Sequence, residues 1–141
     1  YRLEISGLFH DVGKIAIQDQ IINKSGPLTD QEWADIMRHP EVGCWILRSS
    51  HDIPDIAEYV LYHHERYDGS GYPKKLQGEE IPLLSRIISV ADSYDAMTNE
   101  RSYKDTLDQE SAIYELIINK GKQFDPKIVD IFIDKVLKPN C

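Results

Sequence analysis

The chain has 141 residues, of which 41% are hydrophobic and 28% are charged, and its formal net charge at pH 7 is −8. This length and composition indicate one folded domain with its own core and exclude a disordered chain. The acidic balance argues against binding to polymeric DNA or RNA, which relies on clustered Lys and Arg side chains facing phosphates. A small anionic nucleotide is compatible with it, because bound divalent metal ions would supply positive charge locally.

Cysteine usage indicates a reducing compartment, and hydropathy indicates that the given sequence contains no membrane-spanning segment. The two cysteines, Cys44 and Cys141, are too few for a disulfide framework. No stretch approaches the roughly 20 apolar residues that a membrane-spanning helix needs, and no signal segment opens the chain. We therefore expect a cytoplasmic domain. Because the sequence begins at Tyr1, within an expected helix and without a Met, it is expected to be a fragment. An upstream sensory or receiver domain, or a membrane anchor, would precede it.

Apolar spacing predicts helices through the first half of the chain. Residues 3–9 form the last turns of one helix, and residues 23–27 form a loop. Thr29, followed three residues later by a Glu, is a capping-box signature for a helix over residues 30–38. That helix is expected to end at His39, because a residue before proline is disfavoured in the helical region. A further helix is expected over residues 41–49.

The second half is also helical. A helix that Pro54 opens is expected to end in His63-His64-Glu65, and residues 66–81 form a turn-rich loop. Pro82 starts a long helix, and two more helices are expected over residues 108–120 and from Asp125-Pro126 onward. The sequence contains no period-two strand pattern and no internal repeat. The predicted fold is an all-α bundle.

Four of the five histidines lie at expected helix ends, and one of them is followed by an aspartate: His10-Asp11, His39, His63 and His64. Imidazole and carboxylate ligands together suit Mn, Fe or Zn, and a carboxylate can bridge two such ions. Adjacent residues on a helix point about 100° apart. His63 and His64 are therefore expected to flank a site with two ions rather than to share one. This pattern favours a polynuclear cluster over a lone structural zinc.

Each of these residues has a structural alternative when it is taken alone. A single buried histidine is usually a hydrogen-bonded core residue, and His51 is expected to be solvated or to cap the next helix. Asp92 is different, because it lies among apolar neighbours in the long helix, where an unpaired buried carboxylate is costly. The candidate metal ligands point to a metal site only as a set: His10, Asp11, His39, His63, His64 and Asp92.

Basic residues follow the acidic ones. Asp95 shares a helix face with Asp92, and Arg101 and Lys104 come near the end of the same helix. A basic pair beside an acidic metal site suits the non-bridging oxygens of a phosphodiester. The alternative is a solvated helix end whose cations complement the helix dipole. Lys14, one turn after His10-Asp11, has the same two interpretations.

These motifs together resemble the HD-GYP domain, a subgroup of the HD-domain metal phosphohydrolases. The resemblance rests on an HDxGK motif at 10–14, an HHE…DGxGYP signature at 63–73, and a DxxDAMT…RxYK segment at 92–104. His39-Pro40 lies where the family carries another ligand histidine. Taken alone, the loop at 68–73 indicates only an exposed turn with an aromatic, because it lacks the strand–loop–helix setting of a phosphate cradle. The resemblance covers essentially the whole chain, so residues 1–141 are expected to form one HD-GYP domain.

The resemblance implies an HD-domain helical bundle that holds two or three divalent ions, Fe or Mn. Family members carry a further upstream helix with another ligand histidine, and only nine residues precede His10 here, so the bundle is expected to lack its first helix or helices. The implied ligands are the six named above, with Asp11 bridging, and the implied catalytic residues are Asp11 and Lys14. The implied substrate contacts are Lys14, Asp95, Arg101, Lys104, Gly71, Tyr72 and Pro73.

The activity implied by the resemblance is hydrolysis of cyclic di-GMP to pGpG, and in some members onward to GMP, in bacterial second-messenger signalling. In the family, the loop that contains Gly71-Tyr72-Pro73, called the GYP loop below, is also associated with docking to diguanylate cyclase (GGDEF) domains. Two alternatives stay open. One is a generic HD phosphohydrolase acting on linear nucleotides such as guanosine polyphosphates, against which the GYP loop argues. The other is a non-hydrolysing module that binds cyclic di-GMP or a partner domain. The missing upstream ligand favours it, and the intact later ligands argue against it.

Overall fold

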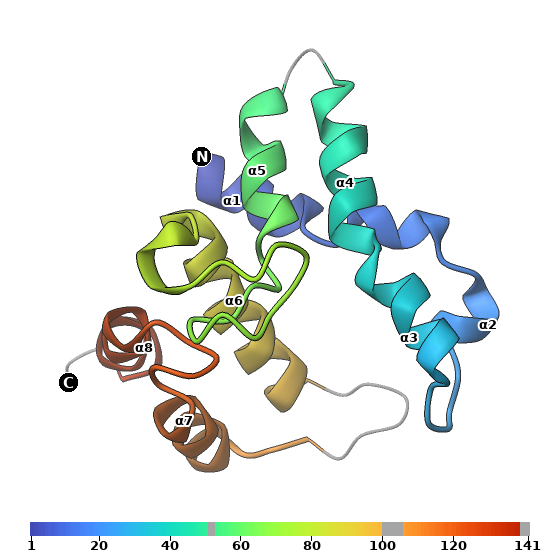
Figure 1. Cartoon of the computed structure of the whole chain (residues 1–141). Coiled ribbons are helices and arrows are strands. Elements are labelled where there is room, and N and C mark those ends of the chain that lie inside the picture. The colour runs from blue at the N-terminus through green and yellow to red at the C-terminus, as the bar shows by residue number, and fades with distance from the viewer. Residues whose placement is uncertain (51–52, 100–105, 139–141) are drawn as a thin grey trace.

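The computed structural model describes residues 1–50, 53–99 and 106–138, in which helices joined by turns and loops make up the fold (Figure 1). The α-helices are α1 (Arg2–Phe9), α2 (Asp19–Ile22), α3 (Asp30–Met37), α4 (His39–Arg48), α5 (Ala57–Leu61), α6 (Leu83–Thr98), α7 (Gln109–Ile118) and α8 (Pro126–Phe132). Short 3₁₀ segments are η1 (Val12–Ala16), η2 (Pro54–Ile56) and η3 (Gly78–Glu80), and α8 continues into a π-helical turn, η4 (Ile133–Leu137). The described residues contain no β-strand, and the all-α prediction is confirmed.

Local sequence signals start several of these helices as expected. Thr29 and Glu32 form the predicted capping box of α3: the Thr29 side chain accepts from the Glu32 backbone N–H, and the Glu32 carboxylate accepts from the Thr29 backbone N–H at 2.7 Å. Lys24 adds an ion pair to the same carboxylate at 2.6 Å. Asp108 and Asp125 cap α7 and α8 with their side chains. These contacts satisfy backbone donors that a helix start leaves unpaired.

Two helix boundaries differ from the prediction, and both concern histidines. His39 does not end α3 but begins α4, with Pro40 in its first turn. Proline is favoured there because its missing N–H would have had no intrahelical partner. α5 ends at Leu61, so His63 and His64 lie in the turn after the helix rather than on it. Segments η1 and α2, in the stretch before the predicted loop, were not expected.

Two hydrophobic clusters hold the helices together. The first contains Cys44, Leu47, Ile56, Ala57, Val60 and Leu61, from α4, η2 and α5. The second contains Val90, Ile113, Leu116, Phe124, Val129 and Ile133, from α6 to η4. α1 contacts both α5 and α6 and so joins the two halves. Figure 1 shows the loop after α5 running across the front of α6, between the two halves of the molecule.

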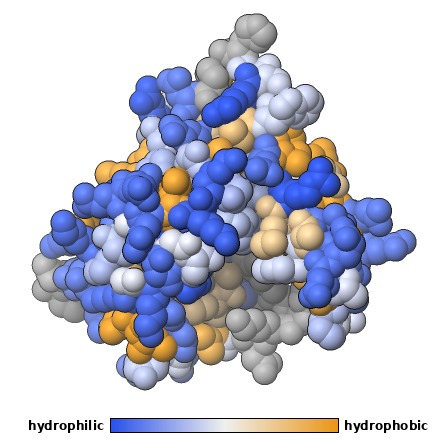
Figure 2. All heavy atoms as spheres, in the orientation of Figure 1, coloured by the Kyte–Doolittle hydropathy of each residue, from blue (hydrophilic) through white to orange (hydrophobic). Residues whose placement is uncertain are grey.

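Hydrophilic residues cover most of the face seen in Figure 2, with hydrophobic ones interspersed. Within the described ranges, no helix is both long enough and apolar enough to cross a membrane.

Candidate metal centre

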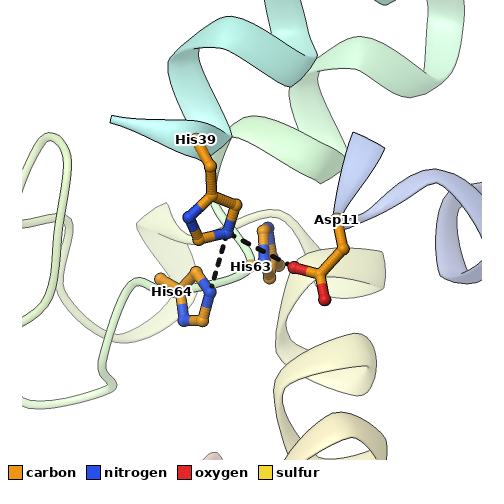
Figure 3. A group of neighbouring side chains, drawn as sticks. All are labelled: Asp11, His39, His63 and His64. Carbon is orange, nitrogen blue, oxygen red and sulfur yellow. Dashed lines mark hydrogen bonds and ion pairs between the residues drawn. The ribbon is translucent and has the colours of Figure 1, made fainter. Parts of the chain in front are cut away.

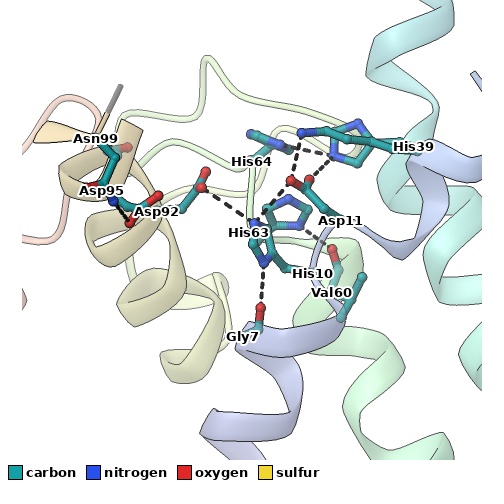
Figure 4. A network of polar contacts seen from close by, with 12 residues as sticks. Gly7, His10, Asp11, His39, Val60, His63, His64, Asp92, Asp95 and Asn99 are labelled. Atoms are coloured by element: carbon teal, nitrogen blue, oxygen red, sulfur yellow. Dashed lines mark hydrogen bonds and ion pairs between the residues drawn. The ribbon is translucent and has the colours of Figure 1, made fainter. Parts of the chain in front are cut away.

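Segments far apart in the sequence bring their imidazole and carboxylate groups to one place between the two halves of the fold (Figures 3 and 4). His10-Asp11 follows directly on α1, His39 opens α4, and His63-His64 follows α5. Asp92 reaches the same place from the middle of α6. Helix ends supply most of these groups, so each side chain is held by the packing of the helix beside it.

Four of the six expected ligands form a compact group: Asp11, His39, His63 and His64. Each offers one ligand atom, and these atoms all lie within 4.8 Å of one another (Figure 3). His39 and His63 are only 1% exposed. The geometric argument that kept His63 and His64 from sharing one ion assumed that both lie on a helix, and that assumption was wrong. In the turn after α5 their ring centroids are 4.0 Å apart and their ligand atoms converge.

Three of the histidines are oriented by the same local hydrogen bond. Nδ1 of His10, His39 and His63 lies 2.6, 2.6 and 2.5 Å from the backbone carbonyl oxygen three residues earlier. A carbonyl oxygen can only accept, so each Nδ1 is the protonated nitrogen that donates. Nε2 is then the nitrogen that can carry a lone pair toward a metal ion. Fixing the tautomer and the ring direction in this way is typical of metal-ligating histidines.

The Nε2 atoms of this group face one another rather than protein donors. Nε2 of His63 is fully buried and has no hydrogen-bond partner among the described residues. Nε2 of His39 lies 3.2 Å from Nε2 of His64 and 3.4 Å from Oδ1 of Asp11. Buried lone pairs that converge without donors are costly unless a cation satisfies them. The cluster therefore has the composition and arrangement of a divalent metal site, in keeping with the ligands that such ions take.

His10 and Asp92 extend the group toward α6. Nε2 of His10 lies 3.4 Å from Oδ2 of Asp11 and 3.5 Å from Oδ1 of Asp92. These separations are long for hydrogen bonds, so we treat them as ion-pair contacts. One carboxylate oxygen of Asp11, Oδ1, thus faces His39. The other, Oδ2, faces His10 and lies 2.7 Å from the Lys14 ammonium.

Burial and charge set the protonation of the group. Burial lowers the pKa of His63 to about 4 and that of His64 to about 2, and it also lowers the pKa of His39. All three are therefore neutral at pH 7, as metal binding requires. The contact with Asp11, followed by that with Asp92, raises the pKa of His10 to about 10. This position attracts positive charge, whether a proton or a metal ion supplies it.

The two carboxyl groups stay ionised although they are partly buried. Burial by itself would raise the pKa of Asp11, but contacts with His10 and Lys14 outweigh it and hold that pKa well below its usual range. Burial likewise opposes ionisation of Asp92, and the contact with His10 lowers its pKa overall. The centre therefore offers two anionic ligands beside neutral imidazoles.

A cavity of about 450 Å³ opens beside the cluster. His63, His64 and Asp92 line it together with residues from α3, the GYP loop, α6 and the turn before α8. The sequence analysis assigned no role to Trp33, Met37, Arg66, Ser89, Ser93 and Gln123, which also line it. A cavity of this size that adjoins a polar cluster is typical of a small-molecule site.

The structure places the expected substrate residues at different sites. Tyr72 and Gly71 line the cavity beside the cluster. Asp95 does not: it lines a neighbouring groove of about 370 Å³ between α1 and α6, together with His10 and Asp92. Figure 4 shows it beside Asn99, whose side-chain amide donates to it. Arg101 and Lys104 lie outside the described residues.

The GYP loop packs against the His/Asp cluster and is not simply an exposed turn. The Tyr72 ring stacks on the His64 ring with centroids 5.0 Å apart and planes 16° apart, and the Tyr72 backbone N–H donates to the His64 carbonyl at 3.3 Å. Burial, and then the nearby charges of Asp11 and Asp92, raise the pKa of Tyr72 to about 12, so the phenol stays protonated. Pro73 follows a cis peptide bond.

Glu65 holds this loop in place, which the sequence analysis did not foresee. Glu65 is 2% exposed, and its carboxylate accepts from the backbone N–H groups of Lys74 at 2.6 Å and Leu76 at 3.1 Å. Gly71 allows the close packing, because a Cβ atom there would lie 2.3 Å from the Arg66 backbone nitrogen. The available signal was the position of Glu65, directly after the two cluster histidines.

Comparisons with known proteins agree with this geometry. The family model described as HD domain matches residues 1–128. A 3'3'-cGAMP-specific phosphodiesterase 2 of Vibrio cholerae is 46% identical over 127 residues, which cover 89% of this chain and 24% of that protein. A cyclic di-GMP phosphodiesterase response regulator of Xanthomonas campestris is 44% identical, with 93% of this chain and 35% of that protein covered. A cyclic di-GMP phosphodiesterase of Thermotoga maritima is 42% identical, with 93% and 36% covered. The chain thus spans about a quarter to about a third of the length of these relatives.

Solved structures share the fold. An HD-GYP protein of Bdellovibrio bacteriovorus superposes with a TM-score of 0.70 at 18% identity, covering 92% of this chain and 41% of that one. A cyclic GMP-AMP-specific phosphodiesterase of V. cholerae superposes with a TM-score of 0.68 at 22% identity, covering 92% and 36%. The fold, the converging cluster and the match over residues 1–128 lead to one conclusion: this chain belongs to the HD domain family, and its motifs are those of the HD-GYP subgroup.

Proposed function

We propose that the chain is the catalytic domain of a metal-dependent phosphodiesterase that hydrolyses cyclic di-GMP to pGpG, to GMP, or to both, in bacterial second-messenger signalling. The observation that carries this proposal is a partly buried His/Asp cluster, two of whose histidines line a cavity of about 450 Å³. The names of the relatives from X. campestris and T. maritima support cyclic di-GMP as the substrate. We take residues 1–141 as one HD-GYP domain.

The proposed cofactor is a set of two or three Fe or Mn ions. Asp11, His39, His63 and His64 would hold them together with His10 and Asp92. Bound ions of this kind lower the pKa of a coordinated water and stabilise negative charge on a phosphoryl group. Mixed imidazole and carboxylate ligands suit both metals.

The chain's own residues would bind and orient the substrate. The Lys14 ammonium lies 2.7 Å from Asp11, and the Lys14 side chain is 38% exposed. Lys14 is proposed to stabilise charge on the phosphate oxygens. Asp11 is the second proposed catalytic residue, because it would fix the metal ions. The loop residues Gly71, Tyr72 and Pro73 are proposed to form one wall of the substrate site.

Further substrate contacts are proposed for Asp95 and for the residues that follow α6 in the sequence. We propose that Asp95 contacts the substrate from the neighbouring groove. Arg101 and Lys104 are proposed phosphate contacts on sequence grounds alone. The wider proposals are a cytoplasmic location, an upstream sensory or receiver domain, and docking of diguanylate cyclase (GGDEF) domains at the GYP loop.

A second substrate deserves the same test. One relative with 46% identity carries the name of a 3'3'-cGAMP-specific phosphodiesterase. The same cluster and cavity would serve either cyclic dinucleotide, because the bond to be cut is a phosphodiester in both. The two cyclic dinucleotides differ in one base, so selectivity between them depends on the contacts made to that base.

The test is anaerobic loading of the purified chain with Fe(II) or Mn(II), followed by a substrate panel. The panel contains cyclic di-GMP, 3'3'-cGAMP, linear pGpG and a guanosine polyphosphate, with products separated by chromatography. Hydrolysis that prefers a cyclic dinucleotide supports the proposal. Preference for the guanosine polyphosphate would identify a generic HD phosphohydrolase. Tight binding of cyclic di-GMP with no product from the fully loaded protein would identify a regulatory module.

A further inference from the structure

One wall of the cavity beside the metal cluster is aromatic and belongs to α3. The Trp33 side chain lines the same cavity as His63, His64 and Asp92, and the residue is 48% exposed. Met37, one turn later on the same helix face, lines it too. A large apolar side chain left half exposed at a concave site is more informative than one on a convex surface, because concave sites are where ligands are bound.

The position of Trp33 is tied to the metal cluster through the backbone. The capping box of Thr29 and Glu32 defines the start of α3, and the ion pair between Lys24 and Glu32 reinforces it. α3 ends at Met37, and α4 begins two residues later at His39, a member of the cluster. The indole and the cluster histidine are thus six residues apart on two directly joined helices. This short connection gives Trp33 a defined place relative to the cluster.

We propose that Trp33, backed by Met37, is the surface on which a purine base of the substrate stacks while its phosphodiester lies at the metal cluster. The inference rests on the proposed function and names a base-binding residue for it. A base is joined to its phosphate through a single ribose, so a base site has to belong to the same cavity as the phosphate site. Trp33, which is half exposed and lines this cavity, meets that requirement.

Stacking on an aromatic side chain does not distinguish one base from another, because every base has a π-face. Trp33 therefore contributes affinity for guanine-containing and adenine-containing cyclic dinucleotides alike. Discrimination between bases requires hydrogen bonds to their edges. Arg66 and Gln123, which line the same cavity, carry the side-chain donors and acceptors that could read those edges.

The chain offers a matched control, because it contains two tryptophans. Trp45 lies on α4 and is 71% exposed, and it does not line the cavity. The variant Trp45→Phe keeps only the Trp33 indole, and Trp33→Phe keeps only the Trp45 indole. Each variant then reports fluorescence from a single known position.

The first experiment titrates both metal-loaded variants with a hydrolysis-resistant phosphorothioate analogue of cyclic di-GMP. Saturable quenching is expected in Trp45→Phe and not in Trp33→Phe. Quenching that is equal in both variants, or confined to Trp33→Phe, would overturn the inference. Quenching in Trp45→Phe alone supports base stacking even if the wild type shows no turnover, and that combination would overturn only the enzymatic part of the proposed function.

The second experiment separates binding from chemistry. Trp33→Ala is expected to raise the KM for cyclic di-GMP and for 3'3'-cGAMP by about tenfold or more, the loss typical of one base–aromatic stack, with a smaller change in kcat. Trp33→Phe should recover most of this loss, and Trp45→Ala should behave as the wild type. The rise should also exceed any change in KM for a base-free dialkyl phosphate.

Three results would count against the inference. If the wild type hydrolyses cyclic di-GMP and Trp33→Ala has the same KM, the stacking role is wrong while the proposed function stands. If Trp33→Ala changes kcat and KM for the base-free diester as much as for cyclic di-GMP, the residue supports the cluster rather than a base. If the wild type neither binds nor hydrolyses any cyclic dinucleotide, the proposed function fails, and the stacking role fails with it.

Discussion

Gly13 lies so close to the backbone of His39 that a Cβ atom added at Gly13 would be 1.8 Å from the His39 carbonyl oxygen. It would also lie 2.6 Å from the Gly43 backbone nitrogen. η1, which contains Gly13, therefore packs directly on the first turn of α4. This contact joins the segment after the His10-Asp11 pair to the helix that carries a third member of the cluster.

Gly13→Ala is expected to be strongly destabilising, because backbone atoms rather than a flexible side chain occupy the space. We expect a loss of roughly 3 kcal/mol or more in the free energy of unfolding, at the upper end for overpacking. Metal content should fall with it, since His39 has to move. Urea unfolding and elemental analysis measure the two effects. Gly26→Ala is the control, because no atom lies within 4 Å of its added Cβ. Similar stability of the two variants would contradict the packing described here.

Removal of a buried cluster histidine should abolish metal-dependent stabilisation. Wild-type protein is expected to gain thermal stability when Mn(II) is added and to lose it with a chelator, because a ligand that binds only the folded state stabilises that state. His63→Ala and His64→Ala should each lose this response and retain less metal. Elemental analysis and thermal denaturation with and without metal check both. His51→Ala, outside the proposed ligand set, should respond as the wild type. Full metal content in both cluster variants would refute the site.

Glu65→Gln should loosen the GYP loop, since one carboxylate accepts from both Lys74 and Leu76. A glutamine has a single acceptor oxygen, and its amide would face the second N–H, which leaves a buried donor unpaired. The expected cost is about 1–3 kcal/mol. Lys74 and Lys75 are exposed, so limited trypsin digestion reports on the loop directly. Faster cleavage there is expected in Glu65→Gln but not in Glu79→Gln, an exposed position nearby. Equal rates would show that Glu65 does not hold the loop.

Two ion pairs of different burial should differ in their effect on stability. Arg86 donates to Asp125 at 2.6 Å, and their side chains are 13% and 4% exposed. This pair joins α6 to the start of α8, and breaking it in Arg86→Ala should cost roughly 3–5 kcal/mol. The exposed pair of Arg2 and Asp55, with side chains 61% and 69% exposed, is the comparison. Arg2→Ala should change stability by less than about 1 kcal/mol. Comparable losses in denaturant unfolding would contradict this ranking.

The capping box of α3 should contribute to the acid sensitivity of the fold. The hydrogen bond from Lys24, and then that from the Thr29 backbone, lowers the pKa of Glu32 below its ordinary value of 4.5. The unfolded chain therefore takes up this proton first as the pH falls. The stabilisation from Glu32 is complete above pH 4.5 and is lost as the pH falls through the lower, folded-state pKa.

Glu32→Gln should consequently flatten the decline in unfolding free energy below pH 4.5, relative to the wild type. Lys24→Met should produce a smaller flattening, because it removes only the largest cause of the shift. Urea unfolding at a series of pH values measures both slopes. An unchanged slope in Glu32→Gln would mean that this carboxyl has the same pKa in the folded and unfolded chain. Because α3 also carries Trp33, Glu32→Gln tests in addition whether the capping box keeps the Trp33 wall of the cavity in place.

Local sequence was sufficient for most of the helices and for naming the four residues that form the compact cluster. Apolar spacing of three and four residues, the Thr29 capping box and the proline at position 82 act over a single helical turn, so they can be recognised without the fold. His10, His39 and Asp92 were likewise recognisable from their motifs. These features depend on neighbours along the chain.

The arrangement of the site depended on contacts between distant segments. The relative placement of the His63 and His64 rings depends on where α5 ends, and no glycine or proline directly after Leu61 marks that end in the sequence. The carboxylate of Glu65 meets its backbone donors, and Trp33 reaches the cavity, only when the GYP loop and α3 come to the cluster. Position along the chain carries no information about which distant backbone donors or cavities a side chain will meet. Those were decided by tertiary packing.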